Sequence, residues 1–70
     1  MKENWVKTGS LIQQMMYEKR ISPIEMAGKI GCDMKTLFSY LEGARITDTH
    51  LENMAAVLGT TKELLMQDGV

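Results

Sequence analysis

Apolar residues recur along this chain at the three- and four-residue spacing of helices, with little of the alternation that marks strands. Each apolar segment is also bounded by residues that start or stop a helix. The pattern predicts five helices, over residues 4–19, 23–30, 34–42, 49–58 (with a start as early as 47) and from about 60 until the chain frays by Gly69. Because the pattern and its end signals agree, we expect an all-α fold, one compact five-helix domain over residues 1–70.

The end signals of the second and third helices are the clearest. Ser22 is a good N-cap and is followed by Pro23, which suits the first helical position, while Asp33 is a natural N-cap for the next helix. Thr49 with Glu52, and Thr60 with Glu63, have the spacing of a capping box. Only three or four residues separate the second and third helices, so residues 22–43 are predicted to form a helix-turn-helix.

The third predicted helix divides into two faces at 100° per residue. Leu37, Tyr40 and Leu41 fall together and are predicted to be core. Lys35, Ser39 and Glu42 fall on the opposite side. Met34 is marginal and Phe38 lies on the rim, where it would meet thymine methyl groups, bind another protein or simply fill space.

Smaller expectations concern single positions. In the second helix the predicted apolar face consists of Ile24, Met26, Ala27 and Ile30. His50 is predicted to be exposed in the first turn of the fourth helix, and Cys32 to be a buried or half-buried turn residue. Gly9 weakens the first helix unless close packing needs a small residue there.

Composition narrows the function classes. One cysteine and one histidine supply neither a disulfide framework nor the usual ligands of a structural zinc, so no metal or cofactor is predicted. No nucleophile–base pair or phosphate-binding glycine loop is visible, which predicts that the chain is not an enzyme. Neither a signal peptide nor a membrane span is apparent, and we expect a cytoplasmic protein that does not bind membranes.

Over residues 9–65 the chain resembles the lambda-repressor/Cro-type, or Xre-like, helix-turn-helix domains. The resemblance rests on an ungapped series of small and apolar positions: Gly9, Ile12, Met15, Ile21-Ser22, Glu25-Met26-Ala27, Ile30-Gly31, Leu37, Tyr40, Gly43, Leu51, Met54-Ala55, Leu58-Gly59 and Leu64-Leu65. It implies a small sequence-specific DNA-binding transcriptional regulator, a phage or mobile-element-like repressor. Such a protein binds double-stranded operator DNA, usually as a homodimer, with residues 34–42 in the major groove.

The resemblance also implies a set of contact residues. Those implied to contact bases are Met34, Lys35, Phe38 and Ser39. Those implied to contact the DNA backbone are Ser22, Lys29, Thr36, Arg45 and Thr47. The candidates for a dimer surface are the apolar residues Val57, Leu64, Leu65 and Met66, some of which must be core.

Three features depart from the family. Met16 and Leu41 replace a charged pair that relatives often carry, and two apolar residues can replace such a pair at little cost. Pro23 lacks the side-chain donor and N–H that would hold a phosphate. The third predicted helix itself departs, because Phe38 lies on its rim and Glu42 would repel phosphate near a groove. The net charge of −1 is a further concern, since nucleic-acid binders are usually basic. Pro23, this acidic balance and the apolar flank of the third helix favour an alternative, the same scaffold used as a protein-interaction module, such as an antirepressor or a modulator of a partner repressor.

Overall fold

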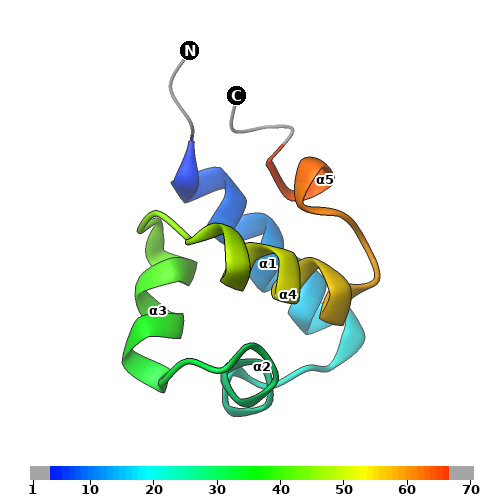
Figure 1. Cartoon of the computed structure of the whole chain (residues 1–70). Helices are drawn as coiled ribbons and strands as arrows, with labels where there is room; N and C mark the ends of the chain where they lie inside the picture. The colour runs from blue at the N-terminus through cyan, green and yellow to red at the C-terminus, as the bar shows by residue number, and fades with distance from the viewer. Residues whose placement is uncertain (1–3, 67–70) are drawn as a thin grey trace.

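The computed structural model describes residues 4–66, which form helices α1 (Trp5–Lys19), α2 (Pro23–Ile30), α3 (Met34–Glu42), α4 (Asp48–Leu58) and α5 (Lys62–Met66) (Figure 1). No strand occurs within these residues. The all-α prediction is confirmed, and each predicted helix is found within one or two residues of its expected start. The predicted fraying at Gly69 lies outside the described residues. None of the five helices combines the length and apolar character needed to cross a bilayer.

Side-chain caps fix most of the helix starts. The Glu25 amide donates to Ser22 Oγ over 3.1 Å, and the Thr36 amide donates to Asp33 Oδ1 over 2.9 Å. Both caps were predicted, because an N-cap depends only on residues three positions away. Helix α4 starts at the early end of its predicted range, with Thr47 as N-cap and no side-chain hydrogen bond. The predicted role of Thr49 as the cap is therefore wrong.

One hydrophobic core joins all five helices. Its fully buried large apolar side chains are Ile12, Met26, Leu37, Ile46, Met54, Leu58 and Leu65. Tyr40 and Leu41 are also buried, as predicted, and Cys32 is half-buried. Ile24 is 73% exposed, so its predicted place on the core face of α2 is wrong. It stands at the second position of α2, in the first turn of the helix.

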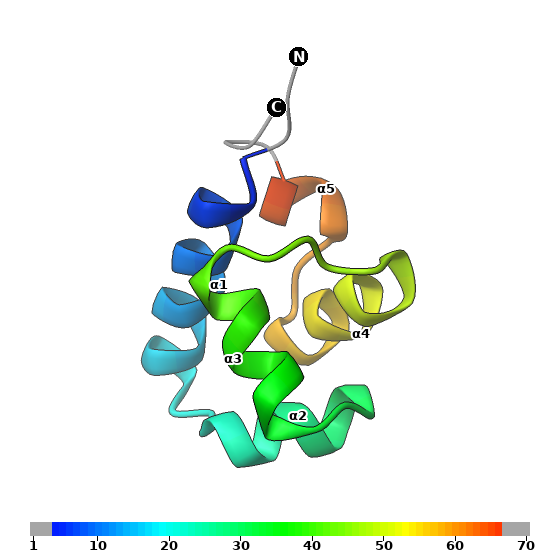
Figure 2. The same cartoon turned by 90° about the vertical axis from the view of Figure 1, so that its left-hand side faces the viewer.

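Helices α1 and α3 lie side by side at unusually close range (Figure 2). A Cβ atom on Gly9 would lie only 2.7 Å from the carbonyl oxygens of Tyr40 and Leu41. The glycine thus lets the two backbones approach, which is the close packing that the sequence left open. Gln13 adds a direct link, because its Nε2 donates to the Leu41 carbonyl over 3.0 Å.

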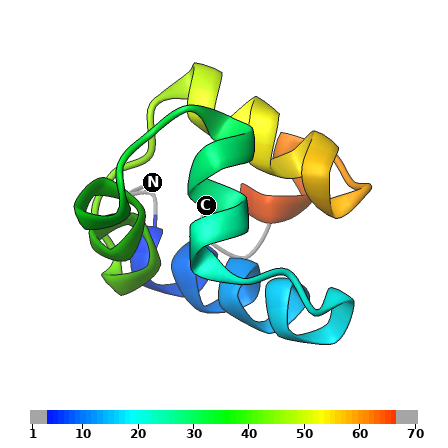
Figure 3. The same ribbon diagram turned by 90° about the horizontal axis from the view of Figure 1, so that it is seen from below.

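The remaining helices close the domain. Helix α2 crosses beneath the others and packs on α3 and α4 (Figure 3), while α5 packs on α1 and α4. The Thr8 hydroxyl, itself buried, donates to Met66 Sδ over 3.8 Å and ties α1 to α5. Among the described residues α3 and α4 make no close backbone contact. They are joined instead by Tyr40 Oη and His50 Nδ1, which lie 2.7 Å apart. His50 is half-buried, so its predicted exposure is wrong.

Candidate functional site

Most of the predicted contact residues lie on the surface of the domain. On α3, Lys35, Phe38 and Ser39 are exposed and Met34 is half-buried. The residues predicted to hold a nucleic-acid backbone are exposed except for the half-buried Thr36: Ser22, Lys29, Arg45 and Thr47. Phe38 lines one surface hollow and Arg45 lines another. Nothing in the geometry tests the predicted contacts, and these roles remain predictions.

The larger hollow is a groove of about 410 Å³, called here the α1–α3 groove. It lies where the second half of α1 and the start of α2 meet α3. Its lining residues are Gln13, Met16, Tyr17, Ile21, Pro23, Phe38, Leu41 and Glu42. Met16 and Leu41, which replace the charged pair of the resembled family, are both buried. Their replacement by apolar residues makes this part of the groove hydrophobic.

Aromatic residues stand at the edge of the α1–α3 groove. Tyr17 is 85% exposed and Phe38 is 46% exposed. The exposed Ile24 follows the lining residue Pro23 directly in the chain. Single exposed apolar residues are common, but several gathered beside an apolar groove mark an interaction surface. Glu42 is the single charged residue that lines it.

The sequence predicted only part of this groove. The rim position of Phe38 and the burial of Leu41 follow from the helical period of α3. Tyr17 was missed, since the apolar pattern of α1 does not show which groove its exposed residues border. The sequence feature that could have located this groove is the pair Met16 and Leu41. These apolar residues stand where the resembled family often carries two opposite charges.

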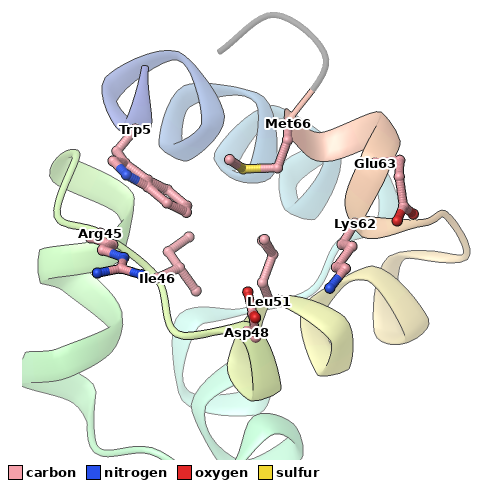
Figure 4. A pocket seen from close by; sticks show the side chains of 8 residues that line it. All are labelled: Trp5, Arg45, Ile46, Asp48, Leu51, Lys62, Glu63 and Met66. Atoms are coloured by element: carbon pink, nitrogen blue, oxygen red, sulfur yellow. The ribbon is translucent and has the colours of Figure 1, made fainter. Parts of the chain in front are cut away.

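A smaller hollow of about 170 Å³, called here the Trp5 pocket, lies at the other end of α1. Its lining residues are Trp5, Arg45, Ile46, Asp48, Leu51, Lys62, Glu63 and Met66. Figure 4 shows Arg45 on one side of this pocket and Lys62 with Glu63 on the other. The side chains of Trp5, Ile46 and Leu51 point inward between them, and Asp48 lies below. Two of these apolar residues, Ile46 and Leu51, are buried in the core.

Charges around the Trp5 pocket are unevenly spread. Lys62 Nζ lies 3.2 Å from Glu52 Oε2. The hydrogen bond between Lys62 and Glu52 is the main cause of a raised pKa of the Lys62 ammonium group. The charges of Asp48, Glu52 and Glu63 raise this pKa further. Lys62 is thus surrounded by carboxylates. Within residues 4–66, Arg45 makes no ion pair. The pocket therefore has a cationic end at Arg45 and an acidic end around Lys62.

Cys32 and His50 line neither hollow. Desolvation by burial, and then the charge of Asp33, raise the pKa of the Cys32 thiol, which disfavours the reactive thiolate. His50 Nδ1 is occupied by Tyr40 Oη. Residues 4–66 contain no group of three or more His, Cys, Asp or Glu residues that would hold a metal ion.

Comparisons with known proteins identify the fold. No protein-family model matches this chain, and no curated protein matches it. Among solved structures, hydroxypropylphosphonic acid epoxidase from S. wedmorenis superposes with a TM-score of 0.78 and 24% identity over 94% of this chain. A crystal structure of apo-HppE gives a TM-score of 0.77 and 23% identity over 90% of this chain. At these identities the likeness establishes a shared fold. In both cases the match covers 36% of the solved chain, so the present chain spans about a third of their length.

These findings correct the family resemblance and the function drawn from it. No family model matches, and the two solved structures reported above are of an epoxidase. The prediction of a phage-like DNA-binding repressor is therefore wrong, and the antirepressor or modulator alternative gains no support. Most of the apolar positions in that series are buried in the core, and Gly9 stands at a close helix crossing. The series therefore carried information on helix packing. The predicted partners, operator DNA and a homodimer, are not tested by the comparisons.

Proposed function

We propose that this chain is a non-catalytic helical module that associates with a second copy of itself through the α1–α3 groove. The observation that carries the proposal is the concentration of exposed apolar side chains, led by Phe38 and Tyr17, beside an apolar groove of about 410 Å³. A domain of 70 residues buries a modest core, and association is one of the usual ways in which so small a domain gains stability.

A second copy suits this face because the face carries both halves of a contact. A two-fold dimer brings the same patch of each subunit together, so a projecting side chain and the hollow that receives it must lie on one patch. Phe38 and Tyr17 project from the rim of the α1–α3 groove. In a two-fold dimer they would enter the groove of the other copy. The net charge of −1 also means that two copies repel each other only weakly.

The proposal includes the absence of catalysis by this chain alone. The solved structures that share its fold belong to an enzyme, but they match it over only 36% of their length. The raised pKa of the Cys32 thiol argues against a catalytic role for this residue. We further propose a cytoplasmic location, with which a single free cysteine is compatible.

Sedimentation velocity over a concentration series tests the association. We expect a concentration-dependent dimer, and we expect Phe38→Ser to raise its dissociation constant at least about tenfold, because truncating a central aromatic anchor commonly costs more than about 1.4 kcal/mol. Leu64→Ser is the matched control, since Leu64 is 52% exposed on α5 and does not line the groove. A protein that stays monomeric at millimolar concentration, or a dimer weakened by Leu64→Ser and not by Phe38→Ser, would overturn the proposal.

A further inference from the structure

We propose that Arg20 and Glu42 fix the orientation of the dimer, because Arg20 of each copy pairs with the glutamate at position 42 of the other. This inference rests on the dimer proposed above. It goes further by naming the two charged residues that select an identical chain as the partner of the α1–α3 groove.

The α1–α3 groove lies between two helices that run in opposite directions (Figure 2). A Cβ atom on Gly43, at the end of α3, would lie 2.7 Å from Cγ2 of Val6, at the start of α1. One turn or two further along α1, Gln13 Nε2 donates to the Leu41 carbonyl. Moving along α1 toward its end is therefore moving along α3 toward its start.

Opposite charges stand at the two ends of this groove. Gln13 and Tyr17 line the groove from one face of α1, and Arg20, three residues beyond Tyr17, continues that face. Glu42 lines the groove next to Leu41, whose carbonyl accepts the hydrogen bond from Gln13. Glu42 is thus at the Gln13 end and Arg20 is at the other. Seven residues of helix, or about 10 Å, separate these ends.

The two charges suit a second copy turned around. Arg20 and Glu42 are both exposed, and neither makes an ion pair within residues 4–66. A two-fold axis through the middle of the groove reverses its direction, so the acidic end of each copy meets the cationic end of the other. The contact forms twice, and the planar guanidinium of arginine matches the geometry of a carboxylate. Copies placed in the same direction would bring like charges together.

The backbone at Arg20 also indicates that its side chain has a function. Arg20 ends α1 in the left-handed conformation, with a φ of 59°, which favours glycine. Helices α2, α3 and α4 end in the same conformation, and each has a glycine there. Glycine would suit the backbone at position 20 as well. We therefore expect Arg20→Gly to raise the dissociation constant of the dimer without lowering the urea midpoint of the monomer.

Sedimentation velocity of two charge-reversed variants tests the pairing. Arg20→Glu and Glu42→Arg each place like charges at both contacts of the dimer, so each variant alone should show a dissociation constant raised at least about tenfold. In an equimolar mixture one copy is negative at both positions and the other is positive at both. Both contacts then join opposite charges again, and we expect a heterodimer with a dissociation constant within about threefold of the original value.

Lys19→Glu is the matched control. It changes the net charge as Arg20→Glu does, at an exposed neighbouring position that lies off the face shared by Gln13, Tyr17 and Arg20. It should change the dissociation constant less than about twofold.

Three results would overturn the pairing. In the first, the mixture stays monomeric although the unaltered chain forms a dimer that Phe38→Ser weakens, which leaves the proposed dimer standing. In the second, Lys19→Glu weakens the dimer as much as Arg20→Glu does. In the third, the unaltered chain itself stays monomeric, which overturns the proposed dimer as well.

Discussion

The two hollows at opposite ends of α1 differ in what they can bury. The α1–α3 groove is wide and lined by apolar side chains, with Glu42 as its one charged residue. The Trp5 pocket has less than half that volume and carries four charged residues around an apolar centre. Removing apolar area from water stabilises contact with another protein surface in the first case.

The difference follows from which helices meet at each hollow. At the groove, α1 and α3 touch backbone to backbone at Gly9, and the side chains beyond that contact are apolar. At the Trp5 pocket, α1 faces a loop and the starts of α4 and α5, where polar residues are common. One end of α1 thus borders α3 through apolar side chains, and the other end borders the polar starts of α4 and α5.

The change with the largest expected effect is Gly9→Ala. The new Cβ would lie about 2.7 Å from the carbonyl oxygens of Tyr40 and Leu41, so the α1–α3 contact must open. Overpacking of this kind lowers the free energy of unfolding by about 1–3 kcal/mol, and backbone atoms that cannot move aside put this site near the upper end. Urea unfolding followed by circular dichroism measures the loss.

Gly28→Ala is the matched control for this prediction. A Cβ at Gly28 meets nothing within 4 Å, and the residue lies within α2. Alanine should therefore stabilise the protein by up to about 1 kcal/mol. Equal destabilisation by both changes would contradict the close approach of α1 and α3.

A smaller effect is expected from Tyr40→Phe, which removes the hydrogen bond between α3 and α4. We expect the free energy of unfolding to fall by about 1 kcal/mol, the usual net value of a part-buried hydrogen bond. Tyr17→Phe serves as the control, because Tyr17 is 85% exposed and should change stability by less than about 0.5 kcal/mol.

A double-mutant cycle sharpens that result. His50→Ala combined with Tyr40→Phe should cost less than the sum of the two single changes. Strictly additive costs would show that the bond between the two side chains contributes nothing. A measurable coupling energy would show that the Tyr40–His50 hydrogen bond holds α3 and α4 together.

The smallest effect concerns Asp33. The hydrogen bond of its carboxylate with the Thr36 side chain, and then that with the Thr36 backbone amide, lower the pKa of the Asp33 carboxyl group. A carboxyl whose pKa is lowered in the folded state stabilises the fold above its unfolded pKa of about 3.9, and loses that contribution as pH falls through the folded value. Asp33→Asn keeps the cap but does not titrate. Below about pH 4, the urea midpoint of the unaltered chain should fall more steeply than that of the variant. Parallel curves would contradict this role.

Local features of the fold could be predicted, and features that depend on distant residues could not. The caps at Ser22 and Asp33 involve residues three positions apart, so the sequence displays them. The inward face of α3 follows from helical periodicity in the same way. His50 was misplaced because its environment depends on Tyr40, ten residues earlier and on another helix.

Function was harder to predict than fold for a physical reason. The spacing of apolar and small residues encodes how helices pack, and many unrelated proteins pack helices in the same way. Exposed side chains such as Tyr17 and Phe38 are not fixed by the packing of the core. Their meaning depends on the hollow that each one borders, which becomes visible only when the helices are placed in space.

The packing of α1 also determines when this helix can become stable. It packs on α3, α4 and α5, while α2 packs on α3 and α4. The hydrogen bonds that join α1 to the rest of the domain span 28 residues from Gln13 to Leu41 and 58 residues from Thr8 to Met66. Such distant pairs form only after a long loop has closed. During synthesis α1 is made before the helices on which it packs, so its apolar stripe stays uncovered until α3 has emerged.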